Sequence, residues 1–153
     1  EIPKRDWSSD VCSSDLDPES LVKRQHDVWQ PLLDWAAAKY GAPLIVAGGT
    51  TFVSQPPQSL ERLAAAVAAH TDLALSALYN LTHVAGSLVI ALAVSERLLP
   101  ADKAFAAAQL DELFQIERWG ADPLATERHE GIVKDIEATA RFLALLEDNR
   151  LRG

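Results

Sequence analysis

The sequence has no methionine and only one cysteine, Cys12, among its 153 residues. One cysteine cannot form a disulfide within the chain, which favours a reducing compartment. The four histidines lack the four-residue spacing of a helical zinc pair, and little thiolate chemistry is present to complete a metal site. We therefore expect no metal site and no cofactor.

Basic residues are also scarce, because 14 lysines and arginines face 22 aspartates and glutamates and give a formal net charge of −8. An acidic surface gains nothing from counterion release on a phosphate backbone, so we expect no nucleic-acid partner. Long apolar runs are missing too. Asn80, Thr82 and His83 interrupt the longest one, which leaves 88–94 as its strongly apolar part, well short of the ~20 residues that cross a bilayer. We expect no membrane insertion.

Catalytic motifs are not evident either. The glycines of "AGGTT" at 47–51 lack the lysine of a phosphate loop, which predicts a turn. Ser87 lacks nucleophile-elbow spacing, and with the preceding glycine it is expected to let another helix approach closely. Asp111 and Glu112 point to different sides of a helix and do not form a converging acid–base pair. We predict that the protein is not an enzyme, and the alternative is a small-molecule site near His83 between helices.

The stretch "DWSSDVCSSDL" at Asp6–Leu16 has no apolar periodicity and favours turns or disorder. One reading frame of a common short-read sequencing adapter encodes these eleven residues without a mismatch, and an index-bearing primer fits the positions before them. We therefore expect residues 1–16 to be an artefactual, disordered tail and the domain to occupy 17–153. The alternative is a genuine disordered tail.

Apolar periodicity predicts helices over most of the remaining chain. A first helix is expected near Pro18, with a kink or a fresh start at Pro31 and a stop at Gly41. The β-branched run Pro43–Gly49 predicts a lone strand or an extended connector.

Four further helices follow in the prediction: one capped by Ser59 and ending near His70, one fully surrounded from Thr71 or Asp72 to about Val94, one from Ala101 to Gly120, and one capped by Asp122 that buries Ile132, Ile136, Leu143 and Leu146. The fold class is therefore mainly α: a bundle of five or six helices with at most one short extended segment near 43–47.

One helix face combines polar and aromatic side chains. Phe105, Ala108, Glu112, Gln115 and Trp119 follow one another at spacings of three and four, which places a carboxylate, an amide and an indole on one side. Aromatic residues beside charged ones are typical of interface anchors, so this face is a candidate recognition surface. The alternative is that the indole covers the edge of the core while the carboxylate is solvated or pairs with an arginine.

Four stretches resemble, in order and spacing, the C-terminal part of the assembly chaperones that hold the α subunit of the F-type ATP synthase. They are "RQHDVWQPLLDWAAAKYGAPLIV", "QPPQSLERL", "GSLVIALAV" and "LDELFQIERWG", within 24–142. The strongest motif is matched by Asp111, Glu112, Phe114, Gln115, Trp119 and Gly120, and a tryptophan-rich signature is matched by Trp29, Pro31 and Trp35. Leu113 stands where the family tends to be acidic.

This resemblance implies a chaperone that binds the unassembled α subunit and promotes its incorporation into the catalytic hexamer. Its partner-binding residues would be Glu112, Gln115, Trp119, Asp111 and Phe114, with the Glu112 carboxylate as the most sensitive. The resemblance also implies truncation from a larger α+β protein whose N-terminal β domain is missing here. It favours the cytoplasm of a bacterium, or the mitochondrion for a eukaryotic member. The alternative is a helical protein-interaction module of unrelated purpose.

Overall fold

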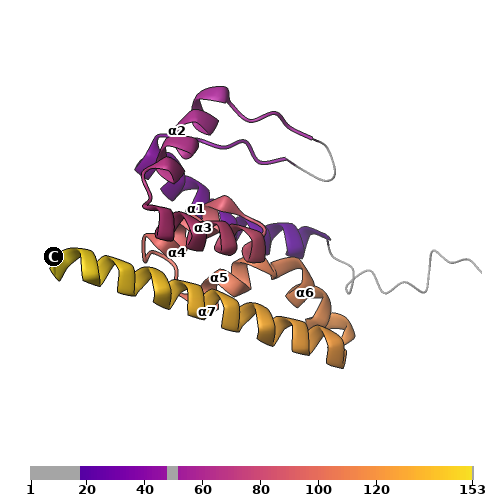
Figure 1. Ribbon diagram of the computed structural model, residues 1–153. Helices are drawn as coiled ribbons and strands as arrows, with labels where there is room; N and C mark the ends of the chain where they lie inside the picture. The colour runs from indigo at the N-terminus through magenta and orange to yellow at the C-terminus, as the bar shows by residue number, and fades with distance from the viewer. Residues whose placement is uncertain (1–17, 48–51, 153) are drawn as a thin grey trace, which may run out of the picture.

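The structure is a computed structural model that describes residues 18–47 and 52–152 (Figure 1). These residues form seven helices and no strand: α1 (Pro18–Tyr40), α2 (Pro57–Ala68), α3 (Asp72–Ala85), α4 (Leu88–Ser95), α5 (Ala101–Ala108), α6 (Leu110–Trp119) and α7 (Pro123–Arg152). The predicted mainly α bundle is confirmed. The predicted tail at 1–16 and most of the predicted turn at 47–51 lie outside the described residues.

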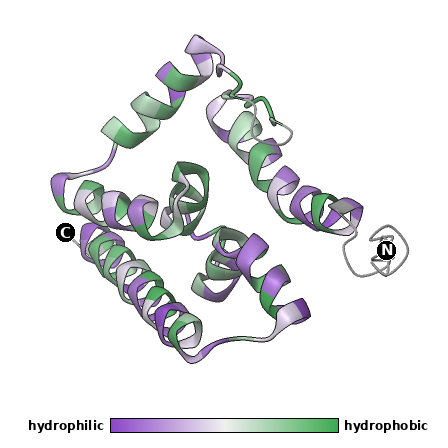
Figure 2. Ribbon diagram, turned by 90° about the vertical axis from the view of Figure 1, so that its right-hand side faces the viewer, coloured by the Kyte–Doolittle hydropathy of each residue, from purple (hydrophilic) through white to green (hydrophobic). Residues whose placement is uncertain are grey.

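Helix α4 forms the centre of the bundle. Its residues from Val89 to Val94 are all buried, because α1, α3, α5 and α7 pack around it. Most helices in Figure 2 alternate between purple and green, whereas α4, in the middle of the view, is green almost throughout. The prediction of a fully surrounded helix is therefore confirmed for this part of the chain.

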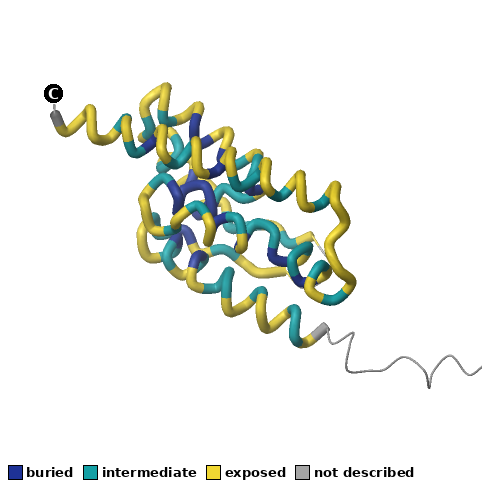
Figure 3. The backbone as a smooth tube through the Cα atoms, turned by 90° about the horizontal axis from the view of Figure 1, so that it is seen from below, coloured by how far each residue is buried: buried dark blue, intermediate teal, exposed yellow. Residues whose placement is uncertain are grey.

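The long helix α7 runs along one side of the molecule, and α2 lies at the opposite side (Figure 1). Ile136 and Leu143 of α7 are buried against the bundle, while Ile132 and Leu146 are half-buried beside them. Figure 3 shows the buried stretches gathered in the middle of the bundle and the exposed ones on its outside. The predicted apolar stripe of the last helix is confirmed.

Side chains cap the starts of α3 and α7, and the cap of α7, Asp122, was predicted. The Ala74 N–H donates to Thr71 Oγ1 over 3.4 Å at the start of α3, and the Ala125 N–H donates to Asp122 Oδ1 over 2.8 Å at the start of α7. Each side chain satisfies a backbone donor that the first turn of a helix leaves without a partner.

The single helix predicted from Asp72 to about Val94 is wrong, because Gly86 divides it into α3 and α4. Gly86 has φ +66°, a left-handed conformation that glycine adopts without steric cost, and the Ser87 hydroxyl then caps α4 by accepting from the Ile90 N–H. A Cβ on Gly86 would meet no atom within 4 Å. The glycine therefore serves the backbone turn, and the predicted close approach of another helix is not found there.

The fresh helix start predicted as one alternative at Pro31 is wrong, since α1 continues through this residue. Proline removes one helical hydrogen bond, a loss that tertiary packing can outweigh. Here Leu32 and Ala36 are buried after the proline, and the Trp29 indole before it donates to the Ala107 carbonyl over 2.8 Å. Gly41, with φ +63°, ends the helix as predicted.

Ser59 was predicted as the cap of α2, but that helix begins two residues earlier, at Pro57. The fixed φ of proline suits the first turn of a helix, so Pro56 and Pro57 start it without a side-chain cap. Ser59 is buried instead, and its hydroxyl donates to the Pro43 carbonyl over 2.7 Å. It ties α2 to the segment that follows α1.

The segment at 42–47 belongs to no helix or strand and has no partner strand among the described residues, while the end of the predicted range lies outside them. The side chain of Gln55 makes hydrogen bonds to this segment in place of a strand. The Ile45 N–H donates to Gln55 Oε1 over 2.8 Å, and Gln55 Nε2 donates to the Ile45 carbonyl over 2.9 Å. One side-chain amide thus makes the pair of hydrogen bonds that a neighbouring strand would supply.

The helix predicted from Ala101 to Gly120 breaks at Gln109 into α5 and α6. Gln109 adopts φ −106° and ψ 21°, outside the helical range, although its carbonyl still accepts from the Leu113 N–H over 2.8 Å. Sequence periodicity continues across this residue, so it gives no sign of the break. The consequence is that Phe105 and Ala108 belong to α5, whereas Glu112, Gln115 and Trp119 belong to α6, and Phe105 packs against the core.

Candidate functional site

Helix α6 carries the predicted recognition residues at the edge of the bundle. Leu110 and Phe114 are buried, which fixes the inner face of the helix. Asp111 and Glu112 occupy its first turn and Arg118 its last, so the charges oppose the partial charges of the helix ends. Gly120, with φ +85°, ends the helix and begins the turn to α7.

Two polar contacts join α6 to α1. Arg24 Nη1 binds the Glu117 carboxylate over 2.8 Å, and Gln25 Nε2 donates to Asp111 Oδ1 over 2.7 Å. Both contacts are solvent-exposed, so each contributes only about 0–1 kcal/mol to stability. Their effect is to set how α6 lies on α1, and one of the predicted carboxylates, Asp111, is already engaged within the protein.

Two guanidinium groups lie over the ring of Phe114. The Cζ atoms of Arg24 and Arg118 are 5.1 Å and 4.5 Å from the centre of its ring. Cations over an aromatic face are attracted by the ring quadrupole. Phe114 is only 9% exposed. It therefore packs α6 against the bundle and leaves little of its own surface available to a partner.

Glu112 points toward α7. Its carboxylate pairs with the Arg128 guanidinium, and its Oε2 lies 3.4 Å from His129 Nε2. That imidazole nitrogen is buried and makes no hydrogen bond within the described chain, while its ring packs edge-on against Phe105, with 5.3 Å between the ring centres. Glu112 is therefore half-buried, with a cation from the next helix already in contact.

Gln115 and Trp119 face solvent on the remaining side of α6. The Trp119 side chain is 75% exposed, and Leu124, across the Gly120 turn, is 79% exposed. Exposed large apolar side chains at one tip of an acidic molecule are typical of a contact site. We call Glu112, Gln115 and Trp119 of α6, together with Leu124 of α7, the α6 surface.

The structure thus places the five predicted residues in different settings. Gln115 and Trp119 are open to solvent, Glu112 is half-buried beside a cation, Asp111 is exposed but hydrogen-bonded, and Phe114 is buried. The alternative in which the indole covers the edge of the core is wrong, because that side chain is largely exposed. The alternative in which Glu112 pairs with an arginine is what the structure shows.

Sequence reasoning missed the neighbours from other helices. Arg24 and Gln25 are more than eighty positions from α6, and no pattern in the sequence links them to it. The pairing of Arg128 with Glu112 could have been predicted from the sequence. Arg128 lies as far after Gly120 as Glu112 lies before it, so an antiparallel helix pair turning at that glycine brings the two together.

Other predicted sites look different in the structure. His83 does not lie between helices but is exposed and stacks on Tyr79, with 6.5 Å between the ring centres. Within the described ranges, no three metal-ligating side chains gather as a possible ion site. None of the helices in the same residues is both long and apolar enough to cross a bilayer.

Solved structures share this fold. Atp12 from Paracoccus denitrificans is 39% identical, with a TM-score of 0.81, over 84% of this chain and 55% of that one. A single-substitution variant of the same protein is 38% identical with the same TM-score and coverage. A protein from Agrobacterium tumefaciens, described as a candidate chaperone, is 39% identical with a TM-score of 0.76, over 86% of this chain and 48% of that one.

The present chain therefore spans about half the length of the structures it matches. No family model matches the sequence.

Proposed function

We propose that this chain is the C-terminal helical part of an ATP synthase assembly chaperone of the Atp12 kind. It binds the unassembled α subunit of the F-type ATP synthase, promotes its incorporation into the catalytic hexamer, and performs no chemical reaction. The observation that carries this proposal is the likeness to Atp12, at 39% identity over 84% of the chain with a TM-score of 0.81.

The α6 surface is the proposed contact with the subunit. Trp119 and Leu124 supply exposed apolar area, and the Gln115 amide can donate and accept hydrogen bonds. The formal net charge of −8 attracts a basic segment of the partner and speeds encounter with it. Glu112 then exchanges its pairing with Arg128 for a lysine or arginine of the subunit, which contributes specificity more than affinity.

The proposal extends to the rest of the protein. The similar structures are nearly twice as long as the part that matches, which accords with a preceding β-rich domain in the complete protein. Residues 1–16 are proposed to derive from a sequencing adapter in place of that domain. The complete protein is proposed to act in the bacterial cytoplasm, or in the mitochondrion for a eukaryotic member.

A capture assay tests this function. Purified α subunit, unfolded in urea, is diluted into buffer with the chain, and the soluble subunit is measured by light scattering and by co-elution. We expect the chain to keep more subunit soluble and to elute with it. If neither the chain nor its genomic full-length form does so, the function is instead that of an unrelated helical interaction module.

The variant Trp119→Ala locates the contact, and Tyr79→Ala is its matched control. Both aromatic side chains are 75% exposed, so neither change should lower the free energy of unfolding by more than about 0.5 kcal/mol. We expect Trp119→Ala to weaken capture by tenfold or more, as for an aromatic anchor worth about 2 kcal/mol, and Tyr79→Ala to leave it unchanged. Equal effects of the two variants would remove the α6 surface from the proposal.

A further inference from the structure

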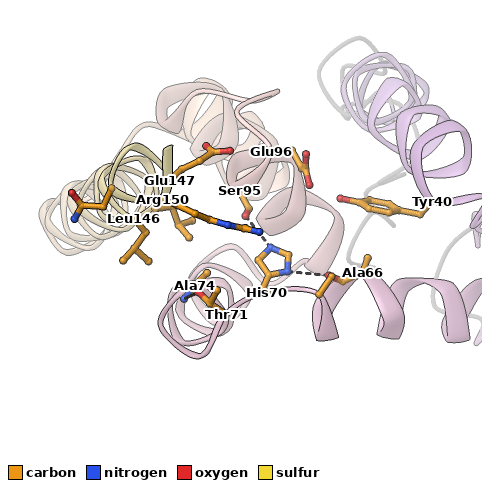
Figure 4. Close-up of a pocket in the computed structure, with 13 residues that line it drawn as sticks. Tyr40, Ala66, His70, Thr71, Ala74, Ser95, Glu96, Leu146, Glu147 and Arg150 are labelled. Carbon is orange, nitrogen blue, oxygen red and sulfur yellow. Dashed lines mark hydrogen bonds between the residues drawn. The ribbon is translucent and has the colours of Figure 1, made fainter. Parts of the chain in front are cut away.

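A pocket of about 550 Å³ opens between the C-terminal ends of α2 and α4, the start of α3 and the last turns of α7 (Figure 4). Its volume lies in the range of small-molecule sites. It shares no residue with the α6 surface, so its role is a separate question.

One wall of the pocket is apolar. Leu143 and Leu146 of α7 line it together with the small side chains of Ala66, Ala69 and Ala74. An aliphatic chain placed against this wall would remove apolar surface from water without burying a polar group, which favours binding. The pocket therefore suits an apolar chain a few carbons long.

His70 stands in the pocket with both ring nitrogens engaged. Nδ1 lies 2.9 Å from the Ala66 carbonyl oxygen, and Nε2 lies 3.1 Å from Ser95 Oγ. Because a carbonyl oxygen only accepts, Nδ1 carries the proton, and in the neutral ring Nε2 accepts from the Ser95 hydroxyl. These two hydrogen bonds fix the orientation of the imidazole ring, which forms a polar part of the pocket wall.

The two carboxylates of the pocket are paired with cations. Glu96 binds Lys39 Nζ over 2.7 Å, and Glu147 binds Arg97 Nε over 3.1 Å. Neither is left to attract a cationic ligand. The acidic side chains of the pocket therefore do not select its occupant.

The cation of the pocket lining is Arg150, and the Asn149 amide in the same lining can both donate and accept hydrogen bonds. Arg150 makes no ion pair within 18–47 and 52–152, and Figure 4 shows its side chain reaching from α7 toward His70 and Ser95. Tyr40 also lines the pocket, and its hydroxyl lies next to the Glu96 carboxylate.

We propose that this pocket binds an apolar chain that ends in a carboxylate, with the Arg150 guanidinium as the partner of the carboxylate and the Leu143–Leu146 wall as the seat of the chain. A planar guanidinium matches a carboxylate through two parallel hydrogen bonds. Two sources share this chemistry: a free aliphatic acid, and the carboxyl terminus of a polypeptide that ends in an apolar residue.

The test is a titration of the protein followed by NMR shifts of its backbone amides. The probes are hexanoate, its uncharged analogue hexanamide, and a short peptide that ends in leucine, with a free or an amidated carboxyl terminus. We expect saturable shifts at Ala69, His70, Thr71 and Ser95 with hexanoate or with the free-acid peptide, and binding at least tenfold weaker for the uncharged form. Binding of hexanoate assigns the free acid as a source, and binding of the peptide alone assigns the polypeptide.

The variant Arg150→Gln tests the anchor. Its matched control is Arg141→Gln, because Arg141 is an exposed arginine of the same helix outside the pocket lining. We expect Arg150→Gln to weaken binding of the acid about tenfold and Arg141→Gln to leave it unchanged. The proposal is overturned if no probe gives saturable shifts, if the uncharged forms bind equally well, or if the two variants behave alike.

Discussion

At the scale of single residues, Glu112 has two possible roles that its contacts alone do not separate. It pairs with Arg128 and so ties α6 to α7, and it is also the carboxylate proposed to meet a cation of the partner. Replacing it removes both interactions. A variant of the cation breaks the internal pair and leaves the carboxylate available.

We therefore predict opposite outcomes for Glu112→Gln and Arg128→Gln in the capture assay. Glu112→Gln should weaken capture of the α subunit, because a neutral amide cannot pair with the partner's cation. Arg128→Gln should leave capture equal or stronger, because the carboxylate no longer has an internal competitor. Circular dichroism should show the same helix content in both. Equal losses of capture would mean that the pair matters only for the position of α6.

Tyr40 gives a second prediction at this scale. Burial raises the pKa of its hydroxyl to about 12, and the negative charge of Glu96 adds to the effect. In the unfolded chain the pKa is about 10, so from about pH 10 to about pH 12 the unfolded state binds fewer protons and the free energy of unfolding falls as pH rises. Urea unfolding across this range should show the fall, and Tyr40→Phe should lessen it. The control Tyr79→Phe, at an exposed tyrosine, should not.

At the scale of elements, periodicity located the helices but not the breaks between them. Asp122 was predicted as a cap because its side chain binds the backbone locally. The break at Gly86 lay inside an apolar run whose pattern continues on both sides of it. Pro31 shows the reverse case, in which packing of neighbouring residues outweighs a local helix breaker.

The candidate site divides in the same way. The faces of Gln115 and Trp119 followed from their spacing along one helix, which is a local property. The hydrogen bond from Gln25 to Asp111 and the contact of the Arg24 guanidinium with the Phe114 ring depend on how α1 lies against α6. Such contacts between distant parts of the chain leave no periodic signal in a single sequence.

Two glycines yield a paired prediction for the helices. Gly86 is left-handed, whereas Gly131 lies within α7, and a Cβ on either would meet no atom within 4 Å. Gly86→Ala should therefore lower the free energy of unfolding by about 1–2 kcal/mol through backbone strain alone. Gly131→Ala should raise it by about 0.5–1 kcal/mol, since alanine favours the helix. Urea denaturation measures both, and changes of the same sign would contradict the two assigned conformations.

At the scale of the whole molecule, the bundle depends on one short apolar helix. Helix α4 is in contact with four others, α1, α3, α5 and α7, while α7 also packs directly on α3 and α5. The peripheral helices α2 and α6 rest on fewer neighbours. The free energy of unfolding therefore depends mainly on the central helix α4, while the proposed partner contact lies at the edge of the bundle.

The substitution Leu92→Ala tests this division. Leu92 is fully buried at the centre of α4, and truncation of a buried leucine leaves a cavity that costs about 2–5 kcal/mol. The control Leu124→Ala removes an exposed leucine and should change the free energy of unfolding by less than about 0.5 kcal/mol. Urea denaturation compares the two. A small effect at Leu92 would show that α4 is not the centre of the cooperative unit.

The exposed indole at the tip of α6 has a practical consequence. Trp29 and Trp35 are half-buried in the bundle, whereas Trp119 is in contact with water. Its fluorescence is therefore sensitive to quenchers in solution, and a bound subunit that covers it would shift its emission toward shorter wavelength. The protein thus carries its own optical reporter of complex formation, with no dye required.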